Sequence, residues 1–267
     1  ISMPPAGSAS SPLKFLNFSS VQASDVFSKP ISIKELCDVI KQCKDNSAPG
    51  EDNIHYSMLK YLPDHGLQYI LEFFNVIFLK GLFPNSWRTA KVIPILKPDS
   101  DPKDPNSYRP ISLISCLSKL LEGIINKRLI WFLEKNNLLN INQSGFRTGR
   151  CTLDNLTSLV TEIQQAFAAK KYHITLFLDL QKAYDTCWKS HVLKELKSFK
   201  LTGCLPVYVQ FFLFNRSIKV ETNGAKSDNY GLDLGIPQGS SLSGTLFLIA
   251  VNSMEKCIKN YMYKSFF

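Results

Sequence analysis

The chain has 267 residues, of which 45% are hydrophobic and 20% are charged, a balance typical of a globular protein with a sizeable core. No apolar run approaches the ~20 residues that a transmembrane helix needs, and the N-terminal residues lack the pattern of a signal peptide. The net charge of +9 at pH 7 favours a polyanionic partner, although a basic balance alone does not prove one.

The positive charge is concentrated in one part of the chain. Residues 86–150 hold 11 Lys and Arg residues against 5 Asp and Glu residues. This stretch is either a surface that binds nucleic acid or a basic face that only contacts water.

The cysteines exclude two classes of protein. There are 7 of them, an odd number, and no two have the C-x-x-C spacing of a zinc or redox site. The pattern therefore excludes a disulfide framework, and it indicates reduced thiols in an intracellular protein, nuclear or cytoplasmic.

Residues 1–30 are rich in Ser, Pro and Gly, which predicts a linker or a poorly ordered lead-in. The first residue is Ile1 rather than Met, so we interpret the chain as a fragment of a longer product.

Helices are predicted mainly from caps and periodicity. Ser32 and Glu35 form an S-x-x-E capping box, in which each side chain satisfies a free backbone donor of the other residue, and apolar residues follow at helical spacing as far as Pro49-Gly50. Further helices are predicted over 66–80, 115–135, the residues after 150, 189–200, 206–214 and from about 242 onward.

Strands are expected later in the chain. KVIPILK (91–97) predicts a short strand, whose Pro94 implies an edge or a bulge. The four prolines of 98–110 predict an irregular loop, whereas ITLFLDL (174–180) predicts a central strand buried on both faces. Asn223-Gly224 predicts a hairpin after 217–222. Helices first and strands later indicate the α+β class.

Asp179 is a candidate metal ligand. It lies at the end of the predicted buried strand, and burial of an unpaired carboxylate is unfavourable unless a cation or hydrogen bonds compensate. The alternative is an aspartate satisfied by backbone donors. Asp185, six residues later, is interpreted as a turn or helix-entry residue.

GIPQGSSLSG (235–244) is a candidate ligand loop. Its glycines allow close approach of the backbone to a ligand, and the amide of Gln238 suits a base or sugar edge. A plain connection between a strand and a helix is the alternative.

Two sets of cations are candidate phosphate ligands. Lys97 ends a predicted strand and Arg109 precedes Pro110, and a positioned Lys–Arg pair can neutralise a triphosphate. Arg147 and Arg150 lie among glycines in QSGFRTGR, which suits a nucleic-acid backbone. Surface basic residues and a helix-entry turn are the alternatives.

The order of these motifs resembles one family. SAPGEDNI (47–54), KVIPILKPDSDPKDPNSYRPISLISCLSKLLEGIINKRL, NQSGFRTGRCTLD, FLDLQKAYDTCW and GIPQGSSLSGTLF are similar to the reverse transcriptase domain of non-LTR (LINE-type, jockey-like) retrotransposons. The resemblance covers about residues 32–258, and this combination of motifs is highly specific.

The resemblance implies roles around the reacting nucleotide. Asp179 matches the first metal-binding aspartate of the palm, and the backbone carbonyl of Leu180 would contact a second ion. Tyr184 matches the aromatic residue beneath the incoming sugar, which disfavours a 2′-OH. Gln238 and Gly239 match the loop that lines the pocket for nucleotide and template.

The resemblance also implies roles for the cations. Lys97 and Arg109 look like the residues that hold the triphosphate, and Arg147 and Arg150 would face the template backbone. The implied partners are an RNA template, a DNA primer and deoxynucleoside triphosphates, and the implied cofactor is Mg²⁺, because nucleotidyl transfer by this family uses two divalent ions.

The implied fold is that of a right-hand polymerase. Residues 1–30 would be the lead-in, 31–170 a mostly helical fingers-like part and 171–267 a partial palm, with no thumb. The implied function is RNA-directed DNA polymerase, which is an enzyme activity of the nucleotidyltransferase class.

The sequence departs from the family in two places. Gly244 stands where the family has proline, and no Tyr-Ala-Asp-Asp follows Asn252, where the family carries its other metal-binding carboxylates. We therefore expect this copy not to polymerise. The alternatives are a non-catalytic remnant that still binds nucleic acid and a pseudogene product that does not fold stably.

Overall fold

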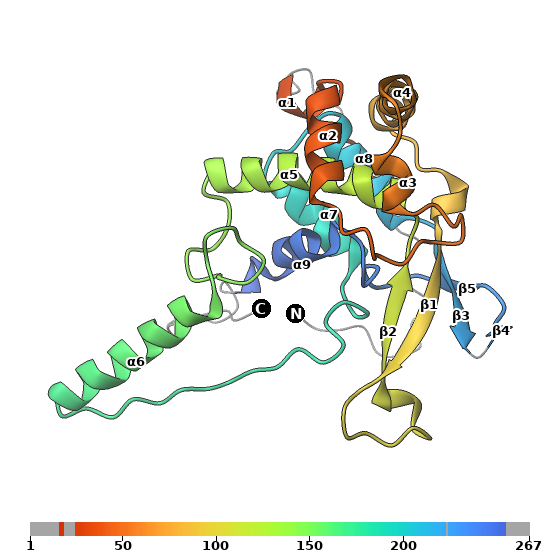
Figure 1. Ribbon diagram of the computed structural model, residues 1–267. Helices are drawn as coiled ribbons and strands as arrows, with labels where there is room; N and C mark the ends of the chain where they lie inside the picture. Colours follow the sequence, from red (N-terminus) through yellow and green to blue (C-terminus); the bar gives the residue numbers. More distant parts are fainter. Residues whose placement is uncertain (1–15, 19–24, 223, 255–267) are drawn as a thin grey trace.

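The computed structural model describes residues 16–18, 25–222 and 224–254. Helices packed beside one mixed sheet make up this part of the chain (Figure 1), which confirms the α+β class. The helices are α1 (Asp25–Ser28), α2 (Ile33–Gln42), α3 (Tyr56–Lys60), α4 (Asp64–Lys80), α5 (Cys116–Lys135), α6 (Thr152–Ala168), α7 (Lys189–Ser198), α8 (Cys204–Leu213) and α9 (Ser243–Val251), with 3-10 turns η1 (Asn85–Trp87) and η2 (Pro105–Ser107). The strands are β1 (Thr89–Leu96), β2 (Tyr108–Leu113), β3 (Arg216–Thr222), β4 (Ala225–Lys226) and β5 (Tyr230–Leu232).

The first long helix begins where its cap predicts. The Glu35 amide donates to Ser32 Oγ at 3.3 Å and the Ser32 amide donates to Glu35 Oε2 at 2.9 Å, which completes the capping box. The Glu35 carboxylate also accepts two hydrogen bonds from Arg128 of α5, at 2.7 and 2.9 Å. One glutamate therefore caps α2 and joins it to α5.

Part of the predicted lead-in packs on the core. Phe18 is 3% exposed and Phe27 of α1 is 2% exposed. The Phe27 ring meets the Phe132 ring edge-on, with centroids 4.8 Å apart. These apolar side chains outweigh the polar composition around them, since each fully buried aromatic ring stabilises the fold by roughly 1.5–3 kcal/mol.

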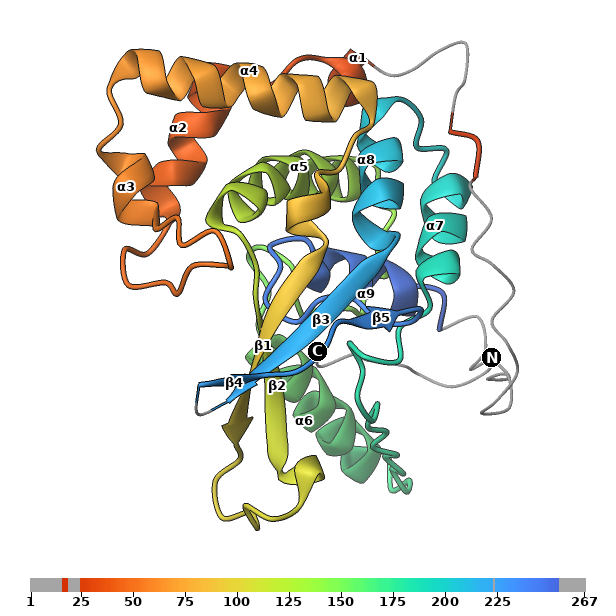
Figure 2. The same cartoon turned by 90° about the vertical axis from the view of Figure 1, so that its right-hand side faces the viewer.

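The core lies between α5, α8 and their neighbours. Phe74 of α4, Leu121 of α5 and Phe212 of α8 are fully buried. Figure 2 shows α4 crossing above α5 and α8, with the sheet below them. None of the described helices is long and apolar enough to cross a membrane.

The described strands form a sheet with the order β2-β1-β3-β4, and β5 pairs with β3. β1 pairs antiparallel with β2 and parallel with β3. Strand β2 was not predicted, because the prolines of 98–110 indicate a loop. Pro94 lies opposite Pro110, and the pairing of β1 with β3 covers only 89–92. Pro94 therefore lies on an edge, as its missing donor requires.

The sheet joins strands from both sides of residue 170, the predicted boundary between the fingers-like and palm parts. That division stays a prediction. β3 and β4 flank the predicted turn at Asn223-Gly224; Asn223 lies outside the described residues, and Gly224 has φ 78°.

The predicted central strand at 174–180 is wrong. These residues are neither helix nor strand, and Ile174, Leu176 and Leu178 are 92%, 79% and 64% exposed. A strand needs a neighbour for its backbone groups, and no described strand pairs with this segment. An apolar run in the sequence indicates hydrophobicity, but it does not show which strand the segment would pair with.

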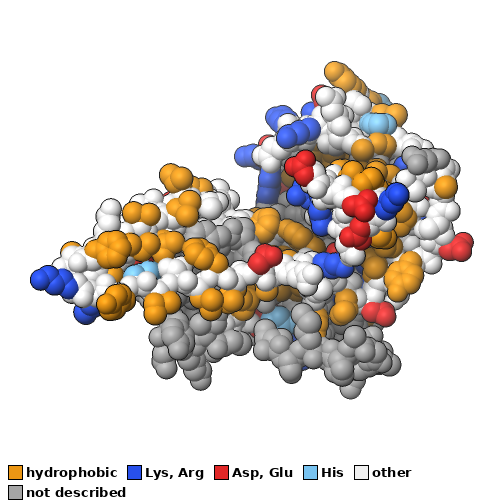
Figure 3. Space-filling view, turned by 90° about the horizontal axis from the view of Figure 1, so that it is seen from below, with side chains coloured by type: hydrophobic (Ala, Val, Ile, Leu, Met, Phe, Trp, Pro, Cys, Tyr) orange, Lys and Arg blue, Asp and Glu red, His pale blue; other side chains and the backbone are white. Residues whose placement is uncertain are grey.

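The same segment belongs to a projecting arm, which consists of α6 and residues 169–180. In Figure 1 the arm extends away from the other helices and the chain returns to the body through 171–180. Figure 3 shows hydrophobic side chains along it. On α6 these are Leu153, Leu156, Val160 and Phe167, which are 67%, 44%, 51% and 70% exposed.

Candidate nucleotide-binding site

The Gln238 loop, residues 235–241, connects β5 to α9 and is tied to the turn that follows Asp179. The Gly235 amide donates to the Cys187 carbonyl and the Ile236 amide donates to the Tyr184 carbonyl, both at 2.9 Å. These bonds bring two motifs together that lie about fifty residues apart in the sequence.

The other side of the Gln238 loop is tied to the sheet. The Ser112 amide of β2 donates to the Gln238 carbonyl at 3.0 Å. At Gly239 the backbone has φ 122°, and an added Cβ would lie 2.5 Å from the Ser112 carbonyl oxygen. Glycine is therefore required here both for the backbone conformation and for the close approach.

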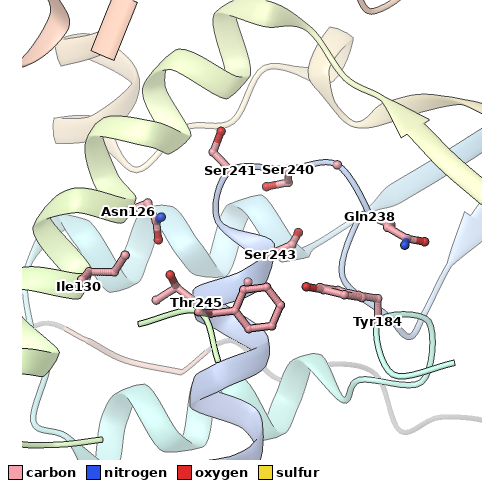
Figure 4. A pocket seen from close by; sticks show the side chains of 11 residues that line it. Asn126, Ile130, Tyr184, Gln238, Ser240, Ser241, Ser243 and Thr245 are labelled. Carbon is pink, nitrogen blue, oxygen red and sulfur yellow. The ribbon is translucent and has the colours of Figure 1, made fainter. Parts of the chain in front are cut away.

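The Gln238 loop forms one wall of a pocket of about 390 Å³ (Figure 4). Three of the predicted site residues, Tyr184, Gln238 and Gly239, line it. The remaining lining residues come from α5, the 140–150 turn, the end of the Gln238 loop and the start of α9, and they are Asn126, Ile130, Phe146, Ser240, Ser241, Ser243, Gly244 and Thr245. The structure thus brings together the residues that the resemblance assigns to the sugar and the base.

Tyr184 is held by aromatic contacts. Its ring centroid lies 5.3 Å from that of Phe247 and 6.5 Å from that of Phe146, the latter in an edge-on arrangement. Burial raises the pKa of the Tyr184 hydroxyl. The neighbouring rings limit movement of the tyrosine, so its position at the pocket is fixed by packing.

Gly244, which departs from the family pattern, has a packing role. A Cβ added at Gly244 would lie 2.8 Å from the Phe146 ring. The missing side chain leaves room for Phe146, which lines the same pocket.

Lys97 and Arg109 lie on one hairpin. Arg109 is opposite Ile95 in the β1–β2 register, and the Lys97 amide donates to the Ser107 carbonyl at 2.8 Å. The Lys97 amine donates to the Asn106 carbonyl at 2.8 Å, and Arg109 is exposed. Neither side chain lines the pocket. A backbone hydrogen bond from Ser112 to the Gln238 carbonyl connects their hairpin to the pocket wall.

Arg147 and Arg150 brace the turn at 140–150. Arg147 pairs with Glu134 at 2.6 Å, its side chain is 9% exposed, and it also donates to the Asn140 carbonyl at 2.8 Å. The hydrogen bond from Arg147 lowers the pKa of the Glu134 carboxyl. Arg150 donates to the Ile141 carbonyl. These contacts satisfy both guanidinium groups in part, and contact with a template stays a prediction.

Asp179 is exposed, in a segment that forms no strand. No group of three or more His, Cys, Asp or Glu side chains in the described residues could hold a metal ion. These residues alone therefore do not fit a two-ion centre. Asp185 lies in a turn, where its amide donates to the Lys182 carbonyl at 2.9 Å, in keeping with its interpretation as a turn residue.

The sequence reasoning missed three residues near the pocket, namely Glu122, Asn126 and Phe146. Glu122 is 0% exposed on α5. A signal for it exists, because 118, 122, 125 and 129 share one helical face and two of these positions are apolar. A carboxylate inside such a stripe indicates a buried, partnered group. The positions of Asn126 and Phe146 depend on the tertiary structure.

The comparisons with known proteins give the family. The model of the family "Reverse transcriptase (RNA-dependent DNA polymerase)" matches residues 95–267, which is more than half of the chain, and the chain belongs to this family.

Polymerases of mobile elements are among its relatives. The chain is 35% identical over 225 residues to the RNA-directed DNA polymerase from mobile element jockey of Drosophila funebris, covering 84% of this chain and 24% of that protein. It is 33% identical over 224 residues to the jockey polymerase of Drosophila melanogaster, again covering 84% and 24%. It is 28% identical over 232 residues to a Pol polyprotein from retrotransposable element R1 of Bradysia coprophila, covering 84% and 22%. The chain thus spans about a quarter of the length of these curated relatives.

Proposed function

We propose that the chain is part of the RNA-directed DNA polymerase of a non-LTR retrotransposon and that its pocket receives the incoming deoxynucleoside triphosphate. The observation that carries this proposal is the meeting of Tyr184, Gln238 and Gly239 in one pocket, within a chain of the reverse transcriptase family. The DNA primer and the RNA template would approach the same pocket.

In this proposal Tyr184 lies beneath the sugar. Its ring is packed against Phe146 and Phe247 and cannot easily turn aside for a ribose 2′-OH. Gln238 offers an amide at the rim, and the exposed Gly239 leaves its backbone open to the nucleotide. These features support selection of deoxyribose over ribose.

Lys97 and Arg109 are the proposed triphosphate ligands. Both lie on the hairpin whose Ser112 amide holds the Gln238 loop. A fixed cation pair would offset the negative charge of the phosphates. Because Lys97 donates to the Asn106 carbonyl, nucleotide binding through its amine would require that this bond be exchanged.

Mg²⁺ bound through Asp179 and the Leu180 carbonyl stays a proposal. Two-ion nucleotidyl transfer needs several oxygen ligands, and the described residues do not supply them. Because the sequence also carries no Tyr-Ala-Asp-Asp after Asn252, we expect the 267-residue polypeptide not to extend a DNA primer on an RNA template. Extension of the primer in Mg²⁺ by this polypeptide alone would contradict that expectation.

The proposal is tested by nucleotide binding with matched tyrosine variants. Wild type, Tyr184→Ala and Tyr172→Ala are titrated with a deoxynucleoside and a ribonucleoside triphosphate in Mg²⁺. Tyr172 is 99% exposed on the arm and serves as the control. We expect Tyr184→Ala to reduce the preference for the deoxynucleotide by about tenfold, and Tyr172→Ala to leave it unchanged. Absence of binding by the wild type, or equal effects of the two variants, would exclude this pocket as the nucleotide site.

A second candidate function is nucleic-acid binding without catalysis. It is favoured by exposed cations within the basic stretch, among them Lys127 and Lys135 of α5. The Lys135 amine lies 4.5 Å from the Trp131 ring, which is itself 46% exposed. An exposed aromatic ring beside a cation suits a single-stranded nucleic acid.

RNA binding over a series of salt concentrations tests this second candidate. The double variant Lys127→Ala/Lys135→Ala is compared with Lys194→Ala/Lys197→Ala, which removes two exposed lysines of α7. Loss of phosphate contacts would reduce the salt dependence by about one unit of slope per lysine. A wild type whose RNA binding does not depend on salt, or equal effects of the two double variants, would exclude the α5 surface as an RNA site.

A further inference from the structure

Glu122 is an unusual residue for its place. It lies on α5 among fully buried apolar residues such as Leu121 and Ile125, and it is itself 0% exposed. Taking a carboxylate out of water is unfavourable, and an apolar residue of similar size often stabilises a protein equally well or better. Stability alone therefore does not account for a glutamate at this position.

The hydrogen bonds of Glu122 point to the Gln238 loop. Its Oε2 accepts from Ser240 Oγ at 2.6 Å and from the Ser241 amide at 3.1 Å. Its Oε1 accepts from Ser118 Oγ at 2.6 Å, within α5. One carboxylate oxygen is thus bound by the loop and the other by its own helix.

Arg216 is a second buried charge of the same core. Arg216 of β3 is 3% exposed; burial lowers the pKa of its guanidinium to about 10, and the charge of Glu122 acts in the opposite direction. Arg216 also donates to the Trp87 carbonyl at 3.1 Å. The Glu122 carboxylate is itself held within α5 by Ser118, and from there it can hold the loop.

We propose that Glu122 is a positioning residue. From α5 it fixes residues 240 and 241 of the loop, and it thereby holds Gln238 and Gly239 at the rim of the pocket. Hydrogen bonds to an ionised carboxylate are roughly twice as strong as those between neutral groups. Hydrogen bonds then hold residues 238–241 of the loop at each end. Ser112 binds the Gln238 carbonyl, and Glu122 binds Ser240 and Ser241. Binding of a nucleotide at this rim rests on the proposed function, whereas fixation of the loop does not.

Two serines make a matched pair of variants. Ser118→Ala and Ser240→Ala each remove one hydroxyl that donates to Glu122 at 2.6 Å, but only Ser240 belongs to the loop. Glu122→Gln keeps the size of the side chain and removes its charge. Amide hydrogen exchange is followed at Ser241, which donates to Glu122, and at Ser112, which donates to Gln238.

We expect Glu122→Gln to accelerate exchange at Ser241 and Ser112 by about tenfold, with amides of α2 and α8 unchanged. Ser240→Ala should accelerate the same two amides by a smaller factor, and Ser118→Ala should not. Unchanged exchange at Ser241 and Ser112 in Glu122→Gln, or equal acceleration throughout the chain, would overturn the proposal. So would equal effects of the two serine variants.

Titration of the same variants with a deoxynucleoside triphosphate separates the two proposals. Faster loop exchange together with a weaker nucleotide affinity supports both. Faster loop exchange with an unchanged affinity supports the role of Glu122 and excludes the Gln238 loop as the nucleotide site.

Discussion

The two halves of the candidate site are built differently. The Gln238 loop is joined by hydrogen bonds to the 184–187 turn, to β2 and to α5. The segment 174–180, which carries Asp179, makes no strand pairing with any described residue and exposes its apolar side chains. Hydrophobicity alone therefore does not bury a segment, because burial also requires a partner for the backbone and for the side chains.

The largest expected difference in stability is between alanine variants of two leucines, one in each kind of region. Leu121 is 0% exposed and Leu178 is 64% exposed. Leu121→Ala should reduce the free energy of unfolding by about 2–5 kcal/mol, and Leu178→Ala by less than about 0.5 kcal/mol. Urea denaturation of both variants and the wild type measures this difference.

A large loss of stability in Leu178→Ala would show that 174–180 is buried in solution, contrary to the structure. A wild type without a cooperative transition would instead support the hypothesis that the chain does not fold stably.

The next largest expected difference in stability is between alanine variants of two glycines that have similar backbone angles. Gly235 has φ 83° and Gly149 has φ 76°, so alanine strains both by roughly 1–2 kcal/mol. At Gly235 a Cβ would also lie 2.8 Å from the Asp185 carbonyl oxygen, whereas nothing lies within 4 Å at Gly149. Gly235→Ala should therefore be less stable than Gly149→Ala by a further ~1–3 kcal/mol.

Thermal unfolding of the two alanine variants measures this second contrast. Equal stabilities would mean that the loop does not approach the 184–187 turn as closely as the structure describes.

The smallest expected effect is a pH dependence of stability that arises from Lys189, a residue close to the Gln238 loop. Lys189 is 2% exposed and donates to the Leu232 carbonyl of β5, and burial lowers the pKa of its amine from 10.5 to about 8. Between these two pH values the unfolded chain keeps the proton and the folded chain loses it. The unfolded state then binds more protons, so the contribution of Lys189 to stability rises with pH, by at most about 1.4 kcal/mol per pH unit.

Lys189→Met should remove this contribution. The free energy of unfolding of the wild type minus that of the variant is measured from pH 8 to pH 10, which cancels the opposite effect of the buried Cys187 thiol, whose pKa burial raises to about 12. A difference that stays constant or falls with pH would show that the Lys189 amine is solvated.

Much of the fold could be predicted from the sequence because its signals are local. The capping box at Ser32 and Glu35 marks the start of α2, and apolar residues at helical spacing mark α4 and α5. β2 was missed since its Pro110 indicates a loop, and its position on an edge of the sheet could not be seen from the sequence.

The candidate site was predictable only in part. The motifs identified Tyr184, Gln238 and Gly239, which the structure places around one pocket. The contacts of Glu122 with Ser240 and Ser241 join residues that are distant in the sequence, and local patterns carry no information on such pairs. The apolar run at 174–180 was misread for the same reason.

Amide hydrogen exchange of the wild-type chain tests the difference between the two halves most directly. We expect slow exchange at Gly235, Ile236 and Ser241, whose amides donate to Cys187, Tyr184 and Glu122. We expect fast exchange at 174–179, for which no backbone hydrogen bond to a described residue exists. Protection of 174–179 equal to that of the Gln238 loop would show that the two halves do not differ in this way.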